Sequence, residues 1–153
     1  MAIAHSLLST DRHNLNNCAI VDCAADCALC PSPDGFDACE PVAAGVLEPC
    51  VAADGSVHHP VGHGIRIKRI ALDDGRSLLA PLYYRCVPEI GFELTATSAL
   101  TDLGLSIEIK GNEMRISTQD GGATSMCRST PDHGKLHLLN ELSAAGQQPW
   151  RVC

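Results

Sequence analysis

The residues with the clearest chemical potential lie at positions 19–32, which read AIVDCAADCALCPS. Cys23, Cys27 and Cys30 have the spacing C-x3-C-x2-C, in which three thiolates can hold an iron–sulfur cluster. The same stretch places Asp22 directly after the apolar run AIV, which is typical of a short buried strand that delivers a carboxylate onto a tight loop. A cysteine-ligated metal and a single positioned carboxylate predict different proteins.

An iron–sulfur enzyme is disfavoured by the rest of the chain. Enzymes with this cysteine spacing need a large α/β barrel around the cofactor, whereas this chain has 153 residues and hairpin patterns downstream. Zinc is harder to dismiss, because three histidines follow in HHPVGHG, but only Cys27 and Cys30 have knuckle spacing. We expect no metal, and we keep a small zinc protein that uses Cys23, Cys27 and Cys30 as the alternative.

The charge balance and the N-terminus exclude several classes of partner. The chain has 11 basic and 18 acidic residues, a net charge of −7, so no general attraction to nucleic acid is expected. Basic residues gather at 66–85, where the alternating pattern predicts a solvated strand face. The first residues lack the parts of a secretory signal, and no window is long enough to span a membrane. We therefore expect reduced thiols, an intracellular, cytoplasmic location, and neither nucleic-acid nor membrane binding.

Alternating apolar and polar residues predict several hairpins. Asp54–Ser56 has the chemistry of a turn in which glycine takes a positive φ. Residues 65–72 predict a strand with a bulge, because the alternation slips, and 77–84 predict the returning strand. Around Gly111–Asn112, the runs SIEIK and EMRIS predict the clearest hairpin.

One short helix is predicted at 97–103, with Thr97 or Ser98 as its N-cap, Leu100 and Leu103 on one face, and Gly104 just past its end. Six to eight short strands and one helix indicate an all-β domain, a small barrel or sandwich. The predicted organisation is a flexible leader at 1–16, a β-barrel domain at 17–120 and a C-terminal extension at 121–153.

In their order, these segments resemble the protease region of copia-type retrotransposon Pol polyproteins, over about residues 18–139. AIVDCAA stands where that family has an apolar strand followed by D-S-G-A, and AADGS, VGHGIRI and LYYRCVPEI match its ADGS, G-x-G and YVP segments. LTDLGLSIEIKGN is the most specific match. HGKLHLL is similar to the family's link toward a pre-integrase region, so 121–153 would be a truncated link.

The resemblance implies a small retropepsin-like β-barrel and a homodimeric aspartic endopeptidase that cuts peptide or polyprotein substrates without a cofactor. Each chain would supply one catalytic aspartate, because a C2 dimer brings two equivalent carboxylates together on its axis. The implied site consists of the catalytic Asp22; the active loop Cys23, Ala24 and Ala25; a flap or substrate-cleft segment, Gly62, His63 and Gly64; and a loop crossing behind the site, Leu94, Thr95 and Ala96.

Two departures from the family pattern bear on activity. Cys23 replaces a hydroxyl residue that links the two active loops, and a thiol is a weak hydrogen-bond donor. Ala24 replaces a glycine, which restricts the loop's backbone. Two interpretations therefore stay open: an aspartic endopeptidase, and a non-catalytic β-barrel remnant of a transposon polyprotein.

Overall fold

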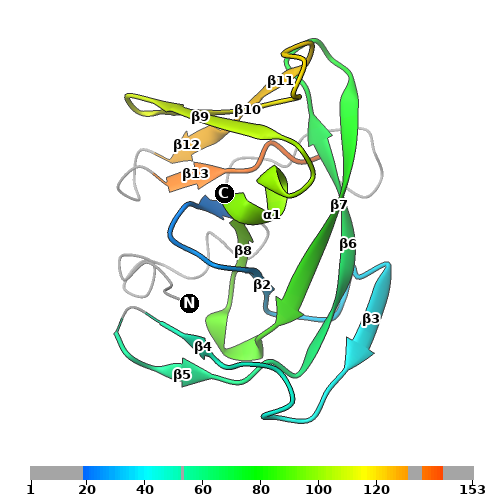
Figure 1. Cartoon of the computed structure of the whole chain (residues 1–153), viewed down its shortest axis with the longest axis vertical. Helices are drawn as coiled ribbons and strands as arrows, with labels where there is room; N and C mark the ends of the chain where they lie inside the picture. The colour runs from blue at the N-terminus through cyan, green and yellow to red at the C-terminus, as the bar shows by residue number, and fades with distance from the viewer. Residues whose placement is uncertain (1–18, 53, 131–135, 143–153) are drawn as a thin grey trace.

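The computed structural model describes residues 19–52, 54–130 and 136–142, and in these ranges the chain is predominantly β-structure (Figure 1). The strands are β1 Ala19–Asp22, β2 Ala28–Cys30, β3 Ala38–Pro41, β4 Cys50–Val51, β5 Val57–His58, β6 Gly62–Ala71, β7 Ser77–Cys86, β8 Glu93–Ala96, β9 Ser106–Lys110, β10 Glu113–Ser117, β11 Thr124–Met126, β12 Arg128–Thr130 and β13 Leu136–Leu138. One α-helix, α1 Thr97–Thr101, and a 3₁₀ turn at Pro88–Ile90 complete the described elements.

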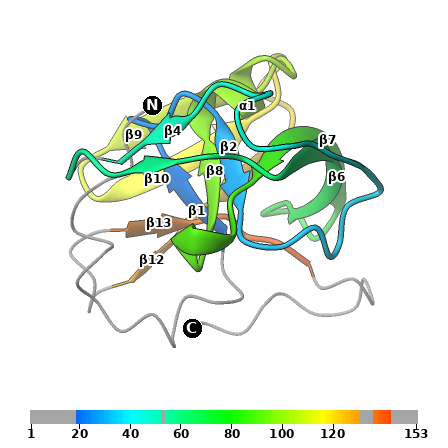
Figure 2. The ribbon, with the colours of Figure 1, turned by 90° about the horizontal axis from the view of Figure 1, so that it is seen from below.

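Eight strands form the main sheet in the order β12-β13-β1-β8-β2-β7-β6-β3. A three-stranded sheet, β11-β10-β9, lies beyond α1, and the hairpin β4–β5 lies at the opposite end of the molecule (Figures 1 and 2). The expected all-β class with one short α-helix is confirmed. The two outer strands β12 and β3 are not paired with each other, so the described strands do not close into a barrel.

The centre of the main sheet explains the continuous apolar run before Asp22. In β1, Ile20 packs in one buried cluster while Ala19 and Val21 pack in a second cluster. β2 repeats this division, with Leu29 in the first cluster and its neighbours in the second. Strands covered on both faces need apolar residues at successive positions, and this is why AIV and ALC do not alternate.

β8 lies between β1 and β2. It pairs parallel with β1, over the register Ala19 to Glu93 through Asp22 to Ala96, and antiparallel with β2 at Leu29 and Leu94. The residues between β1 and β2 therefore pass around the C-terminal end of β8, from which α1 continues. Because β8 runs between β1 and β2, the start of α1 lies beside the loop that follows Asp22.

The long hairpin β6–β7 forms one side of the molecule (Figure 1). Its ten residue pairs run from Gly62 opposite Cys86 to Ala71 opposite Ser77 without an interruption. The predicted bulge is therefore wrong. The sequence pattern slips because the apolar residues change faces while the backbone register stays regular: Ile67 is exposed, whereas Ile70 is buried.

The prediction that the basic residues of this hairpin form a solvated face is wrong for Lys68, which is 4% exposed. Lys68 Nζ forms ion pairs with Glu93, at the start of β8, and with Glu141, the latter at 3.1 Å. Arg66 Nη1 bonds Glu93 Oε2 at 3.0 Å. Both cations also lie near the ring of Tyr84. The side chains of Lys68 and Arg66 point inward because carboxylates from two other segments pair with them inside the fold.

The other two predicted hairpins are confirmed. β4 and β5 pair around a turn in which Gly55 has φ +84°. β9 and β10 pair with Lys110 opposite Glu113, which leaves the predicted two-residue turn, and Gly111 has φ +61°. Both turns rest on local glycine chemistry, so their sequence signals are reliable.

α1 agrees with its prediction in place and differs in detail. Its N-cap is Ala96, and no side chain caps the first turn, so the expected Thr97 or Ser98 cap is wrong. Leu100 is buried, but Leu103 is 42% exposed. Gly104 has φ +84°, and its amide donates to Thr101 O at 2.9 Å.

The described part of the predicted extension at 121–153 is hydrogen-bonded into the two sheets. β11 pairs with β10, β12 pairs with β13, and β13 covers the free edge of β1 with Ile20 opposite Leu138. The predicted leader at 1–16 lies outside the described residues. No helix in the described ranges is long and apolar enough to cross a membrane.

Replacing Glu93, the carboxylate shared by Lys68 and Arg66, tests the ion cluster. We expect Glu93→Gln to lower the free energy of unfolding by about 3 kcal/mol, because Arg66 loses its carboxylate partner and Lys68 loses one of two. Asp74→Asn is the matched control, since its pair with Arg76 is exposed and contributes little. Urea denaturation measures both variants, and equal stabilities would contradict this role of the cluster.

The two glycines of G-x-G predict unequal effects. A Cβ at Gly64 would lie 1.9 Å from Ala38 O, in the backbone of β3, whereas at Gly62 the nearest atom, Glu40 O, is 3.2 Å away. We expect Gly64→Ala to destabilise by about 2 kcal/mol, by forcing β3 away from β6, and Gly62→Ala to cost less. Equal unfolding midpoints for the two variants would contradict the close β3–β6 approach.

Candidate functional site

Asp22 ends β1, and its carboxylate is held by the loop that follows. The backbone amide of Ala24 donates to Asp22 Oδ1 at 2.8 Å. This local turn is typical of aspartate, whose short side chain reaches the amide two residues later. The hydrogen bond thus fixes the carboxylate to the first two residues of the loop.

The second oxygen of this carboxylate, Oδ2, differs from Oδ1 in its hydrogen bonding. Asp22 Oδ2 is buried and has no hydrogen-bond partner among the described residues. A carboxylate oxygen without a partner costs more free energy than one exposed to water, so such atoms are rare in structural positions. The hydrogen-bonding capacity of this atom is therefore unused among the described residues.

The loop after Asp22 contacts α1 and a buried cluster on one side, and its first two residues are exposed on the other. Ser98 Oγ, in α1, donates to Asp26 O at 3.4 Å and links the helix to the end of the loop. Ala25 is buried and packs in the cluster that contains Cys50 and Ala52, next to the β4–β5 hairpin. Cys23 and Ala24 are exposed. The structure thus presents the two residues after Asp22 at the surface.

The predicted loop behind the site, Leu94 to Ala96, is strand β8 itself. Leu94 packs with Ile20 and Leu29, and Thr95 is fully buried with its hydroxyl 2.7 Å from Tyr84 Oη. This segment is therefore a strand paired on both sides, with β1 and with β2, rather than a loop.

The predicted flap or substrate-cleft residues lie away from any turn. Gly62, His63 and Gly64 begin β6 and are paired on both sides, with β3 and with β7. His63 Nδ1 lies 2.8 Å from Tyr83 Oη. The hairpin whose residues pack against the Asp22 loop is β4–β5. Its turn motif DGS was visible in the sequence, but no signal in the sequence indicated its position beside Asp22.

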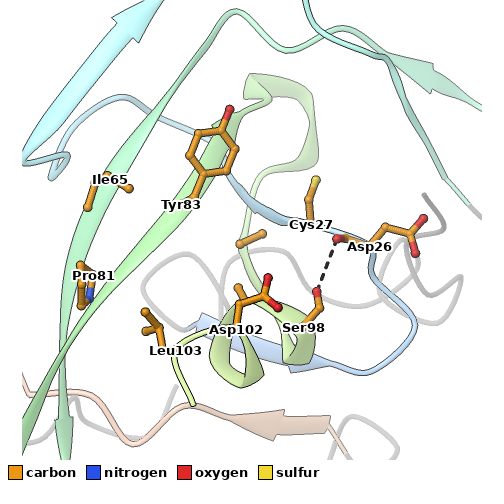
Figure 3. Close-up of a pocket in the computed structure, with 10 residues that line it drawn as sticks. Asp26, Cys27, Ile65, Pro81, Tyr83, Ser98, Asp102 and Leu103 are labelled. Atoms are coloured by element: carbon orange, nitrogen blue, oxygen red, sulfur yellow. Dashed lines mark hydrogen bonds between the residues drawn. The ribbon is translucent and has the colours of Figure 1, made fainter. Parts of the chain in front are cut away.

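A cavity of about 230 Å³ lies between α1, the end of the Asp22 loop and the hairpin β6–β7 (Figure 3). Its apolar walls come from both strands of the hairpin and from the helix, and Tyr83, Asp102 and Ser98 supply polar groups. The lining residues are Asp26, Cys27, Ala28, Ile65, Pro81, Tyr83, Ser98, Ala99, Asp102 and Leu103. Sequence reasoning missed this cavity, because its residues come from four separate segments without a motif.

The three cysteines of C-x3-C-x2-C have different environments. Cys23 is exposed, Cys27 is partly buried, and Cys30 is buried with its thiol 3.3 Å from Ser32 O. In the described part of the chain, no group of three or more histidine, cysteine or acidic side chains could hold a metal ion. The zinc alternative at Cys23, Cys27 and Cys30 has no support in this geometry.

Four of the described cysteines lie in two pairs, Cys27 with Cys50 and Cys30 with Cys86, and the pKa values of their thiols differ. Cys27 and Cys50 are hydrogen-bonded; this contact, with Arg85 nearby, lowers the pKa of Cys50 to about 7, whereas the pKa of Cys27 is raised by the same hydrogen bond and by burial. Cys30 and Cys86 lie opposite each other on β2 and β7. Burial raises the pKa of Cys30 to about 12 and also raises the pKa of Cys86.

Comparisons with known proteins give no neighbour for this chain: no family model, no curated protein and no solved structure matches it.

Metal removal provides a direct test of the site chemistry. We expect a chelator such as EDTA to leave the unfolding midpoint of the purified protein unchanged, because the described fold is held by strand pairing and apolar clusters. Thermal unfolding with and without chelator, together with metal analysis of the protein, measures this. Loss of structure on chelation, with zinc released in proportion to protein, would restore the zinc interpretation.

Proposed function

We propose that the chain is one half of a homodimeric, retropepsin-like aspartic endopeptidase, derived from a copia-type polyprotein, with Asp22 as its catalytic residue. The observation that carries the proposal is the state of the Asp22 carboxylate. One oxygen is fixed by the Ala24 amide, and the other is buried and unpartnered among the described residues, at the end of a strand.

The dimer follows from the number of carboxylates. Catalysis by an aspartate pair needs a second carboxylate within about 3 Å, so that the two share one proton. Within the Asp22 loop, Asp26 is exposed and its backbone carbonyl faces Ser98, so Asp26 is a poor candidate for that partner. A second copy, related by a twofold axis near the exposed residues Cys23 and Ala24, would bring its own Asp22 to face the first.

In such a pair, the ionised carboxylate takes a proton from a water molecule, which attacks the scissile carbonyl. The protonated carboxyl donates to the carbonyl oxygen, so charge does not build up on it. The Ala24 amide would keep the carboxylate oriented through this exchange, since it donates to Oδ1 and leaves Oδ2 without a partner among the described residues. The substrate would be an extended peptide or polyprotein segment, and no cofactor takes part.

The arrangement around Asp22 supports the same proposal. β8 crosses behind the Asp22 loop, where the family resemblance places Leu94 to Ala96. We also propose that the β4–β5 hairpin covers the substrate in place of Gly62 to Gly64, because Cys50 in β4 and Ala52 just after it pack in the cluster that contains Ala25. A cytoplasmic location is proposed as well, since the cysteines of the described residues are thiols.

A non-catalytic remnant is the second candidate, and the substitution at Cys23 favours it. The Cys23 side chain is exposed, and as a thiol it would link two active loops only weakly. Ala24 is less of an obstacle, because its amide reaches Asp22 in spite of the added methyl group. The difference between the two candidates therefore depends on dimer formation and on the group at position 23.

Peptide cleavage by three proteins decides between these functions. We expect Asp22→Asn to abolish cleavage by the wild-type chain, and Cys23→Ser combined with Ala24→Gly to raise cleavage by about tenfold, because a hydroxyl bridges the two loops more strongly than a thiol. Asp26→Asn is the matched control and should leave cleavage unchanged.

The mass of the protein in solution completes this test. Light scattering should show a dimer at the concentrations at which cleavage is seen, and specific activity should rise with protein concentration. A strict monomer, or cleavage that survives Asp22→Asn, would refute the proposed mechanism. A dimer of the double variant that cuts no peptide would favour the remnant.

A further inference from the structure

The two thiol pairs described above differ in accessibility. Cys27 is partly exposed and lines the cavity beside α1, while its partner Cys50 is buried behind it. Cys30 and Cys86 are both fully buried between β2 and β7. A dissolved oxidant can therefore reach the first pair through Cys27 and cannot reach the second pair in the folded protein.

The two pairs also differ in their neighbours. Arg85 lies beside the Cys27–Cys50 pair: it interacts with Cys50, and its Nη1 donates to Glu48 O at 3.2 Å, two residues before Cys50. A guanidinium next to a hydrogen-bonded thiol pair favours the loss of one proton from the pair, and the thiolate is the reactive form of cysteine. Burial dominates at Cys30 and Cys86 and keeps both as thiols.

We propose that Cys27 and Cys50 form a redox-active pair that closes to a disulfide in the presence of a hydroperoxide. The bond would join the end of the Asp22 loop to β4, and so fix the β4–β5 hairpin against that loop. This inference rests on the contact between the two cysteines, because Cys27 packs against the buried cluster that contains Cys50 and is hydrogen-bonded to it. It holds whether or not Asp22 is catalytic.

The reaction balances with a hydroperoxide as the oxidant. The pair gives up one proton, which leaves Cys50 as the favoured thiolate and Cys27 as the hydrogen-bond donor. The remaining proton then moves from Cys27 to Cys50 along the hydrogen bond, which makes the accessible Cys27 the nucleophile. The Cys27 thiolate then attacks the O–O bond of hydrogen peroxide, which forms Cys27 sulfenic acid and releases hydroxide. The Cys50 sulfur displaces the hydroxyl group from Cys27, the S–S bond forms, and the Cys50 proton leaves with the second hydroxide as water. The first hydroxide takes up the proton that the pair gave up, so two thiols are oxidised by two electrons and one peroxide is reduced to two waters.

Peptide mapping of the oxidised full chain tests the proposal. The protein is treated with hydrogen peroxide at neutral pH, its remaining thiols are alkylated after unfolding, and the chain is cut before aspartates. These cuts place Cys27 and Cys30 in one peptide and Cys39 and Cys50 in another. We expect these two peptides to be joined, and fragmentation to assign the bond to Cys27 and Cys50.

Three variants make the result specific. Cys27→Ser and Cys50→Ser should each abolish the linkage, whereas Cys30→Ser should leave it unchanged. Arg85→Met should slow disulfide formation on the order of tenfold at pH 7, because the pair then keeps its protons. Since Arg85→Met also alters packing, circular dichroism confirms its fold, and its oxidation at pH 9 should approach the wild-type rate.

Other outcomes overturn the inference. The exposed Cys23 and Cys39 report the oxidant dose. If they are oxidised while Cys27 and Cys50 remain thiols, the pair is not redox-active. A disulfide between Cys30 and Cys86 that forms at the same rate, or a Cys27 linked mainly to some other cysteine, would also contradict it.

Discussion

The buried ion cluster around Glu93 connects the parts of this fold that sequence distance separates. Lys68 and Arg66 extend from β6 to the first residue of β8, and Lys68 also reaches Glu141 near the end of the described chain. Burial, the largest cause, raises the pKa of Glu141, so its charge is held in the folded protein at a cost. β8, fixed at its start by these ions, then passes between β1 and β2 and determines where the Asp22 loop can lie.

Local chemistry made much of this structure predictable. Glycine turns at Gly55 and Gly111 gave two hairpins, and the apolar run before Asp22 gave a central strand that ends at the carboxylate. What the sequence could not provide were contacts between distant segments. The inward orientation of Lys68 depends on Glu93 and Glu141, which lie 25 and 73 positions later in the sequence. The alternation of residues within one strand cannot include these partners, and it therefore predicts that the lysine faces solvent.

The candidate site divides in the same way. The strand that ends at Asp22 and the loop after it were predicted from a local motif, whereas the position of Leu94 to Ala96 behind that loop was only implied by the resemblance. The cavity beside α1 and the contact between Cys27 and Cys50 join residues from separate elements. Cysteine spacing suggested a metal at Cys23, Cys27 and Cys30, but in three dimensions Cys27 meets Cys50 and Cys30 lies opposite Cys86. The spacing of cysteines in one segment therefore does not predict a metal site when two of the thiols contact residues of two different strands.

The outward face of β6–β7 carries Ile67 and Leu79, which are 49% and 56% exposed, while Lys68 lies inside. A hairpin shifted by one residue would turn every side chain to the opposite face: it would bury the two aliphatic side chains and release the lysine to water. The same shift would expose Ile70, Leu82 and Tyr84, which are buried on the native inner face, so hydrophobic burial opposes the shifted pairing. The ion cluster opposes the shifted pairing as well, since the shift would carry Lys68 and Arg66 away from Glu93, so charge and burial select the same alignment of these two strands.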